Sequence, residues 1–572
     1  MDAYLPAIMN IAEICAQLGV AEAVISPGSR SAPLVLAFAR HPRIRTRVAI
    51  DERAGAFVAL GIAQESGRPV ALVCTSGTAP LNYGPGIAEA YYQQVPLLVF
   101  SADRPPEWID QQDGQTLQQP GMYQSRVKHC YNLPVDTGHP DAVWQVQRST
   151  AEAVQLATTA PRGPVHLNVP FREPFYPAPG QRVEYGPARV IRQSTGRMVL
   201  DEAQWQELLA ELHGAERVLV VAGQHHPGAE EIQALATLKL ATVGDIVSNL
   251  HGLPGVIHHP DMFLGALDGD LAPRLRPDLL ISFGQSVVSK NLKLYLRKHR
   301  APRHWHVQVA GPVADTYQSL TRIVRLDPAD FLAGLRGRLP ARDHDPYRDL
   351  WRSLEAHSRG LVATLEDVEG FNEFVAVRDV MASLPTGSVL HLGNSMPVRY
   401  ANFVGLRDPT VRVWANRGTS GLEGTMSAAL GASLASDALH VLLVGDLGFF
   451  YDRNALWAEA LPANLRIVLL NNQGGGIFDI LPHASRLPER EVFFLTRHGL
   501  GAENTARDFG LDYHCCDNRA RLAGHLGEFL ATGDRARLLE IRTDMDENTR
   551  FFRHFKQQWG TPPCSNNIPG KP

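Results

Sequence analysis

Several features that would place this chain in a specialised class of protein are scarce. Cysteine is rare, with six in 572 residues, and no pair is spaced as C-x-x-C, so the sequence offers neither a disulfide framework nor a zinc site. Charge of one sign is also lacking. The 55 Lys and Arg residues against 59 Asp and Glu give a formal net charge of −4, which argues against a nucleic-acid-binding protein. No G-x-G-x-x-G follows a predicted strand, which disfavours an NAD(P)-binding Rossmann site.

Long apolar runs are missing as well. No stretch approaches the roughly 18 residues of a membrane-spanning helix. The first residues carry Asp2 and Glu13 without the basic segment that begins a secretory signal. The hydrophobic content of 44% is nevertheless high enough for full-sized cores. The composition therefore predicts a cytoplasmic, multidomain protein without stable membrane insertion.

What is present throughout is a repeated order of short apolar strand, Gly- or Asp-containing turn and helical segment. Apolar residues run continuously in these strands, which is typical of parallel strands covered by helices on both faces. The pattern predicts three parallel-sheet α/β domains, at residues 1–180, 195–340 and 350–560, with polar linkers near 176–194 and 339–349. The predicted strands are Ala23–Ser26, Arg47–Asp51, Val70–Thr75, Pro96–Ser101, Val165–Val169, Val218–Ala222, Leu279–Phe283, His306–Val309, Val389–Leu392, Arg412–Trp414, Val441–Val444, Ile467–Leu470 and Leu538–Ile541.

The most informative segment spans residues 440–478, HVLLVGDLGFFYDRNALWAEALPANLRIVLLNNQGGGIF. One strand ends in Gly445-Asp446, the next in Asn471-Asn472, and three glycines follow from Gly474. Neighbouring parallel strands end on the carboxyl edge of a sheet, where α/β proteins bind ligands. Oxygens of Asp446, Asn472 and the turn backbone suit Mg²⁺, and the glycines would admit a diphosphate close to the backbone. An ordinary strand–turn–helix with an Asp cap produces the same local pattern.

A second candidate lies in the first domain, in RVAIDERAGAFVALGIAQESG. Glu52 stands there at the point where a predicted strand gives way to a helix. A carboxylate in the first turn of a helix interacts favourably with the helix dipole, and that role alone would explain a glutamate at this position.

Together the two segments resemble thiamine diphosphate (ThDP) enzymes of the pyruvate-decarboxylase type, in which Gly-Asp-Gly is followed by Asn-Asn at this spacing. The resemblance implies the ThDP-binding fold and a diphosphate site with Mg²⁺, or Mn²⁺, bound by Asp446, Asn472 and Gly474. It also implies that Glu52 is catalytic, as a buried carboxyl of raised pKa that shares a proton with the aminopyrimidine ring. Such enzymes take the two elements from different subunits, which implies a homodimer or a dimer of dimers with active sites at the subunit interface. The implied cofactor-binding residues are Glu52, Gly421, Leu422, Gly445, Asp446, Leu447, Asn472, Gly474, Gly475 and Ile477.

Further strings narrow the resemblance to one family. SPGSRSAPL, DERAGAF, TSGTA, SADRPPE and QPGMY in the first domain, and GNSMPVRY, ANRGTSGLEGTMSAALG, GDLGFFYD and NNQGGGIF in the last, are similar to the 2-succinyl-5-enolpyruvyl-6-hydroxy-3-cyclohexene-1-carboxylate (SEPHCHC) synthases of menaquinone biosynthesis. Leu447, where other ThDP enzymes have glycine, is usual in this family. The resemblance implies a transferase that decarboxylates 2-oxoglutarate and adds the remaining four-carbon unit, in a 1,4 sense, to isochorismate.

The same resemblance implies which residues contact the substrates. Both substrates are dianions, which the paired N–H donors of arginine bind well. Leu422 would bend the cofactor, and Ile477 and Phe478 would pack over the reacting carbons, although the pattern of this pair fits a helix core equally well. The implied substrate residues are Ser29, Arg30, Arg104, Gln115, Lys290, Ser395, Arg399, Arg417 and Phe478.

Two positions depart from some relatives. Asn291 follows Lys290 where these relatives have arginine, and Gly114 replaces a polar residue beside Gln115. Both departures predict altered substrate affinity rather than a different reaction. Two other interpretations stay open, namely another ThDP-dependent 2-oxoacid decarboxylase or carboligase and a non-catalytic protein of the same fold.

Overall fold

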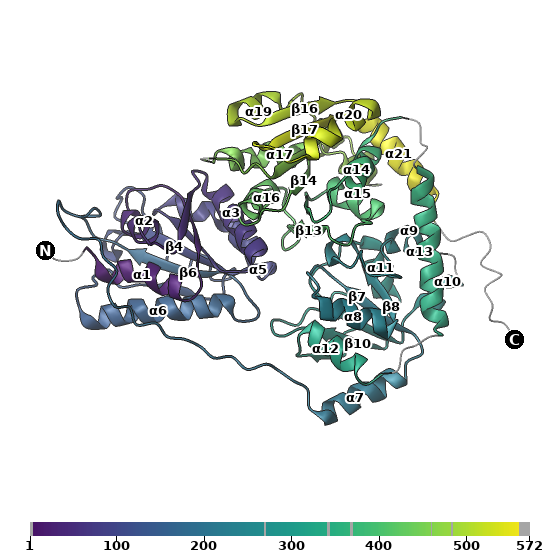
Figure 1. Ribbon diagram of the computed structural model, residues 1–572, viewed down its shortest axis with the longest axis horizontal. Coiled ribbons are helices and arrows are strands. Elements are labelled where there is room, and N and C mark those ends of the chain that lie inside the picture. The colour runs from purple at the N-terminus through teal and green to yellow at the C-terminus, as the bar shows by residue number, and fades with distance from the viewer. Residues whose placement is uncertain are drawn as a thin grey trace.

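The chain forms three parallel-sheet α/β domains in the computed structural model (Figure 1). The structure describes residues 4–267, 270–339, 344–365, 370–458, 460–481 and 484–559. The sheet orders are β2-β1-β3-β4-β6-β5, β11-β10-β9-β7-β8 and β13-β12-β14-β15-β17-β16. The strands are β1 Glu22–Ile25, β2 Arg45–Val48, β3 Val70–Cys74, β4 Leu97–Asp103, β5 Cys130–Asn132, β6 Val165–Pro170, β7 Val218–Ala222, β8 Ala241–Gly244, β9 Leu279–Phe283, β10 Arg303–Val307, β11 Arg322–Val324, β12 Val389–Leu392, β13 Arg412–Ala415, β14 His440–Gly445, β15 Leu465–Asn471, β16 Asp512–Cys516 and β17 Arg537–Arg542.

Helices flank all three sheets. Those of the first domain are α1 Pro6–Gln17, α2 Ala32–Ala39, α3 Glu52–Ser66, α4 Thr78–Asn82, α5 Gly84–Tyr92 and α6 Pro140–Thr158. Those of the central part are α7 Glu202–His213, α8 Ala229–Leu238, α9 Pro260–Leu264, α10 Leu271–Leu275, α11 Lys290–Lys298, α12 Pro328–Arg336 and α13 Pro346–Thr364. Those of the last part are α14 Glu373–Ala382, α15 Met396–Val404, α16 Thr425–Leu434, α17 Asp446–Asp452, α18 Ile477–Ile480, α19 Glu503–Phe509, α20 Arg519–Leu530 and α21 Met545–Gln557.

Both faces of the sheets are buried, which confirms the interpretation of the continuous apolar strands. In β3, Leu72 belongs to the hydrophobic core under α3 and α5, whereas its neighbour Val73 belongs to the core under α1, α2 and α6. Adjacent residues of a strand point to opposite faces, so a strand covered on both sides must be apolar at every position.

Four strands escape the sequence-based prediction, and each lies at the edge of its sheet: β5, β8, β11 and β16. They have three to five residues, and β5, β11 and β16 are partly exposed, so no continuous apolar run marks them. The edge strand β2 is displaced from its predicted range, Arg47–Asp51. Asp51 instead caps helix α3, where its side chain accepts a hydrogen bond from the Ala54 amide at 3.2 Å.

Helices α3 and α16 join the first domain to the third (Figure 1). A Cβ on Gly61 would lie 1.9 Å from the Ala428 carbonyl oxygen, and one on Gly431 would lie 2.1 Å from that of Val58. The two backbones therefore touch at glycine on both sides of the crossing. The core around it runs on from Leu60 in α3 to Leu442 in β14, so the two domains share one hydrophobic interior.

We expect Gly61→Ala to destabilise the protein, because the added methyl group meets a backbone carbonyl that a side-chain rotation cannot move. Overpacking of this kind costs about 1–3 kcal/mol, which should appear as a lower thermal unfolding midpoint in calorimetry. Gly84→Ala is the matched control, since a Cβ on this helical residue meets nothing within 4 Å. Equal effects of the two substitutions would contradict the proposed tight crossing.

Residues 171–201 contain no helix and run as an extended connection from β6 to α7 (Figure 1). Helix α13 packs Trp351 into the central core. The domain limits 1–180, 195–340 and 350–560 stay a prediction, and residues 1, 340 and 560 lie outside the described part of the chain. Over the described residues, the helices include none with the length and apolar character of a bilayer span.

Candidate active site

The candidate site lies at the carboxyl edge of the third sheet. Strands β12, β14 and β15 are neighbours there, and the loops that follow them border a cavity of about 380 Å³. Twelve of the residues predicted for cofactor or substrate line this cavity: Ser395, Arg399, Arg417, Leu422, Gly445, Asp446, Leu447, Asn472, Gly474, Gly475, Ile477 and Phe478. Gly421 is adjacent, and its carbonyl accepts a hydrogen bond from Asn394 Nδ2 at 2.7 Å.

Asp446 and Asn472 are held together by the glycine turn. The Gly474 amide donates to Asp446 Oδ2 at 2.9 Å and lies 3.1 Å from Asn472 Oδ1. Asp446 is 3% exposed, and burial raises the pKa of its carboxyl, an effect that nearby His498 opposes. His498 Nε2 lies 3.4 Å from Asp446 Oδ2. The turn thus presents a buried carboxylate and an amide oxygen to one side of the cavity.

The glycines of this turn are required by packing within the chain. Gly474 has φ of 157°, and a Cβ there would lie 2.6 Å from the Leu495 carbonyl oxygen. A Cβ on Gly475 would lie 2.8 Å from that of Phe494. Any larger residue would push the 494–495 segment away from the turn. The sequence analysis expected these glycines to let a diphosphate approach the backbone closely. In the structure, Gly474 and Gly475 instead allow the close approach of the 494–495 segment of the chain itself.

Glu373, at the start of α14, is a lining residue that the sequence analysis missed. Its Oε1 accepts a hydrogen bond from Asn472 Nδ2 at 2.8 Å, which directs the other amide atom, Oδ1, toward the glycine turn. Burial, together with the charge of Asp446, raises the pKa of Glu373 to about 8. Two buried carboxyl groups beside one amide oxygen form a site that a divalent cation would neutralise.

The lining of the cavity also includes two arginines, Arg399 and Arg417. Burial lowers the pKa of Arg399, and the charge of Arg417 lowers it further. Arg399 Nη1 donates to the Ser395 carbonyl, and Arg417 Nη1 donates to Asn394 Oδ1 at 2.8 Å. Asn394, also missed, follows β12 as Asp446 follows β14, so the strand-end argument could have found it. Two half-buried guanidinium groups in one cavity form a site for an anion.

Lys290 begins α11 and is exposed. It lies within electrostatic range of Lys556 in α21, whose pKa is lowered by burial and by the charges of Lys290 and Arg399. Asn291 forms hydrogen bonds with Asp261. Its side-chain amide donates to the Asp261 carbonyl at 2.9 Å, and its backbone amide donates to Asp261 Oδ1 at 2.7 Å. The asparagine that replaces the arginine of some relatives thus helps to fix the start of α11 to Asp261.

The remaining predicted substrate residues lie at the carboxyl edge of the first sheet and not in the lining of this cavity. Arg30 is buried, donates to the Phe171 carbonyl at 2.8 Å and lies over the Phe175 ring. Ser29 lies 3.1 Å from the Tyr176 hydroxyl. The Gly114 carbonyl accepts a hydrogen bond from the Arg104 guanidinium, at 3.1 Å from Nε. Gly114, which replaces a polar residue of some relatives, therefore contacts Arg104 through its backbone. Gln115 has φ of 57° and packs against Gly77.

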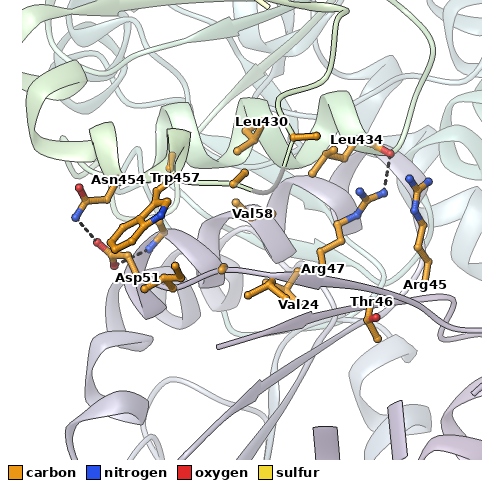
Figure 2. Close-up of a pocket in the computed structure, with 17 residues that line it drawn as sticks. Val24, Arg45, Thr46, Arg47, Asp51, Val58, Leu430, Leu434, Asn454 and Trp457 are labelled. Carbon is orange, nitrogen blue, oxygen red and sulfur yellow. Dashed lines mark hydrogen bonds between the residues drawn. The ribbon is translucent and has the colours of Figure 1, made fainter. Parts of the chain in front are cut away.

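Glu52 also lies outside the cavity lining, and it is half-buried rather than buried as expected. The start of its helix is fixed to the third domain by its two neighbours. Asn454 Nδ2 donates to Asp51 Oδ2 at 2.9 Å, and Arg53 Nη2 donates to the Tyr451 carbonyl at 2.8 Å. Figure 2 shows the Asp51–Asn454 pair on one wall of a cavity of about 240 Å³ between β2 and α16, with Trp457 beside it.

No group of three or more His, Cys, Asp or Glu side chains within the described ranges is arranged to hold a metal ion. The predicted metal ligands do not require such a group, because only one of them is a carboxylate. The other two are the Asn472 side-chain amide oxygen and the Gly474 backbone carbonyl.

Comparison with known proteins places these features in context. The family described as "Thiamine pyrophosphate enzyme, N-terminal TPP binding domain" matches residues 9–125. A 2-succinyl-5-enolpyruvyl-6-hydroxy-3-cyclohexene-1-carboxylate synthase of Cytophaga hutchinsonii is 41% identical over 554 residues, covering 97% of this chain and 99% of the relative. The synthase of the same name from Desulfotalea psychrophila is 39% identical, covering 94% and 98%.

Among solved structures, benzoylformate decarboxylase from Polynucleobacter necessarius aligns with a TM-score of 0.71 at 16% identity, covering 95% of this chain and 99% of that one. At this identity the match concerns the fold alone, and it agrees with the ThDP-binding fold predicted from the sequence.

Proposed function

The chain belongs to the family of SEPHCHC synthases, and we propose that it is a cytoplasmic, ThDP-dependent transferase of menaquinone biosynthesis. The proposed reaction decarboxylates 2-oxoglutarate and adds the remaining four-carbon unit to isochorismate with formation of a C–C bond. The observation that carries the proposal is the cavity at the edge of the third sheet, which combines Asp446 and Asn472 with Arg399 and Arg417.

The residues of this cavity fit the cofactor. Asp446, Asn472 and Gly474 would bind Mg²⁺ or Mn²⁺, whose charge compensates the two carboxyl groups buried there. Gly421 and Leu422 would contact the aminopyrimidine, and the 45% exposure of Leu422 leaves its side chain available for that contact. When bound, ThDP supplies the carbon that bonds to a 2-oxo acid and takes up the electron pair left by CO₂.

The substrates would be held by their carboxylates. Arg399 and Arg417 supply two guanidinium groups inside the cavity, and Lys290 would add a third positive charge. Ile477 and Phe478 give this side of the cavity an apolar surface above the reacting carbons, which helps to exclude water.

We propose further that a second copy of the chain completes the site. Five residues that the proposed reaction uses do not line the cavity of their own chain: Glu52, Ser29, Arg30, Arg104 and Gln115. The reaction requires them together with the residues that do line it. A homodimer, or a dimer of dimers, that places the first domain of one copy over the third domain of the other would supply them. The Glu52 carboxyl would then exchange a proton with the aminopyrimidine ring.

The function is tested by a two-step assay on purified protein with ThDP and Mg²⁺. Release of CO₂ from 2-oxoglutarate is measured first, and the loss of isochorismate absorbance is followed after its addition. Isochorismate loss that requires both ThDP and 2-oxoglutarate supports the proposal. Release of CO₂ without isochorismate loss would point to a ThDP decarboxylase with another acceptor.

Arg399→Ala should weaken the use of isochorismate more than the decarboxylation of 2-oxoglutarate. Loss of a charged hydrogen bond to a carboxylate costs about 1.5–3 kcal/mol, so the KM for isochorismate should rise about ten- to a hundredfold. Steady-state kinetics with each substrate varied in turn measures both effects. Arg453→Ala, at an exposed arginine of the same domain, is the control. A defect confined to the use of 2-oxoglutarate would show that Arg399 does not bind isochorismate.

A further inference from the structure

A carboxylate of the first domain is buried against the loop that carries Arg417. Glu89, on α5, is 1% exposed. Its Oε1 accepts from the Gly418 amide at 2.7 Å, and its Oε2 accepts from the Thr419 amide at 2.6 Å and from the Thr419 hydroxyl at 2.5 Å. One side chain therefore accepts from three donors on two consecutive residues of a loop more than 300 residues away in sequence.

The approach of the two elements is close. A Cβ on Gly418 would lie 2.9 Å from the Glu89 carbonyl oxygen and 3.1 Å from its Oε1. Farther along the loop, Gly424 has φ of 81°, and a Cβ there would lie 2.3 Å from the Phe57 ring of α3. The loop is thus fixed to the first domain at both ends, with Gly421 and Leu422 between the two contacts.

The central domain reaches the same place through glutamines. Gln93, one turn after Glu89, donates to Glu89 Oε1 at 2.5 Å. Gln224 follows β7 and donates to Gln93 Oε1 at 3.2 Å and to the Ala415 carbonyl at 2.8 Å. Gln285 follows β9 and donates to the Gln93 carbonyl at 2.9 Å. All three domains therefore meet at this polar junction.

The fixed loop leads directly into the cavity. Arg417 precedes the two residues that Glu89 binds, and its guanidinium donates to Asn394 Oδ1. The Asn394 amide group in turn donates to the carbonyls of Asn416, at 2.9 Å, and Gly421. A shift of Gly418 would therefore move Arg417 and the chain beside Leu422 together.

We propose that Glu89 is a positioning residue of the active site, which holds the 416–422 loop from the first domain and thereby places Arg417 toward the substrate carboxylates. The inference rests on the proposed function for the identity of those carboxylates. Glu89 itself need not touch substrate, because its oxygens are used by the loop and by Gln93. Its effect is carried by the geometry of Arg417.

The test compares Glu89→Gln with Glu65→Gln in the full-length protein. Glu65 is the matched control because it is also a buried carboxylate of the first domain bound to the third: it accepts from Arg412 at 2.6 and 2.9 Å and from Trp414 Nε1 at 3.1 Å. Its partners lie in β13 rather than in the loop. Both amides keep the volume of the side chain, and Glu89→Gln places an NH₂ group against N–H donors.

Two readouts separate positioning from stability. Amide hydrogen exchange of a peptide spanning 416–422 should be at least about tenfold faster in Glu89→Gln and unchanged in Glu65→Gln. The KM for isochorismate should rise about tenfold in Glu89→Gln, with kcat within about threefold of wild type. Glu65→Gln should lower the thermal midpoint without changing KM.

Unchanged exchange of the loop in Glu89→Gln, or an equal rise in KM in the control, would overturn the proposal. If Glu89→Gln does not fold, Thr419→Val removes the hydroxyl donor from the loop side alone and should give a smaller change in the same direction. If wild-type protein turns over neither substrate, the proposed function fails, and the exchange measurement still decides whether Glu89 holds the loop.

Discussion

Glu52→Gln should slow decarboxylation of 2-oxoglutarate by about a thousandfold, while ThDP binds within about threefold of its wild-type affinity. Glutamine keeps the shape of the side chain but cannot exchange the proton that the proposed role requires. Initial rates of CO₂ release measure the first effect, and calorimetric titration of the apoprotein with ThDP and Mg²⁺ measures the second. Wild-type turnover in this variant would refute the assignment of Glu52.

The position of Glu52 adds a sharper test. Since Glu52 does not line the cavity of its own chain, a site formed between two copies should be restored by mixing inactive chains. Equal amounts of Glu52→Gln and Asp446→Asn chains, unfolded and refolded together, should recover about a quarter of wild-type activity, because half of the dimers are mixed and each has one intact site. No recovery, although mixed dimers form, would place both residues in one chain's site.

Glu65→Gln is the control for helix α3. Glu65 lies on the same helix and bonds to Arg412 and Trp414 of the third domain, so its loss should lower stability without abolishing turnover. A thousandfold loss in this variant as well would mean that the Glu52 effect reports the attachment of α3 rather than proton exchange.

The sequence could locate one side of the candidate site because that side depends on short-range features. Asp446 and Asn472 follow buried strands, and parallel neighbours end at one edge, so two strand ends predict a shared site. The same argument applied to β12 would have predicted Asn394. Arg399 and Arg417 lie on that edge too, and their position in the cavity follows from the order of the strands.

Glu89 and Glu373 could not be found in this way. Each lies in a helix, where a glutamate normally faces water, and each is buried only because another domain or a distant loop packs against it. The edge strands β5, β8, β11 and β16 were missed for a related reason: they are short, and each pairs with a single neighbouring strand of its sheet. Both kinds of feature are set by tertiary contacts, which one sequence does not display.

Asp446→Asn should abolish metal-dependent retention of ThDP while changing the stability of the apoprotein by no more than about 1 kcal/mol, because removal of a buried charge offsets the loss of one hydrogen bond. In the apoprotein the Asp446 carboxylate is buried near Glu373, and burial raises its pKa, so its charge is unfavourable there until a cation binds. An amide removes that charge but keeps only one of the two oxygens. The Leu447 amide donates to Asp446 Oδ1 at 2.6 Å and the Gly474 amide donates to Oδ2 at 2.9 Å, so one of these donors faces an NH₂ group in Asp446→Asn.

Thermal unfolding with and without ligands distinguishes these effects. A ligand present at 100 times its Kd stabilises the protein by about 2.7 kcal/mol, so ThDP with Mg²⁺ should raise the wild-type midpoint and leave that of Asp446→Asn unchanged. Asp452→Asn is the control: this buried carboxylate ends the same helix and accepts from the Ser427 amide at 2.9 Å and from its hydroxyl at 2.8 Å. Its loss should lower both midpoints and preserve the ligand-induced rise. A ligand-induced rise in Asp446→Asn equal to that of wild type would exclude Asp446 as a ligand of the metal, because the cation would then be bound without it.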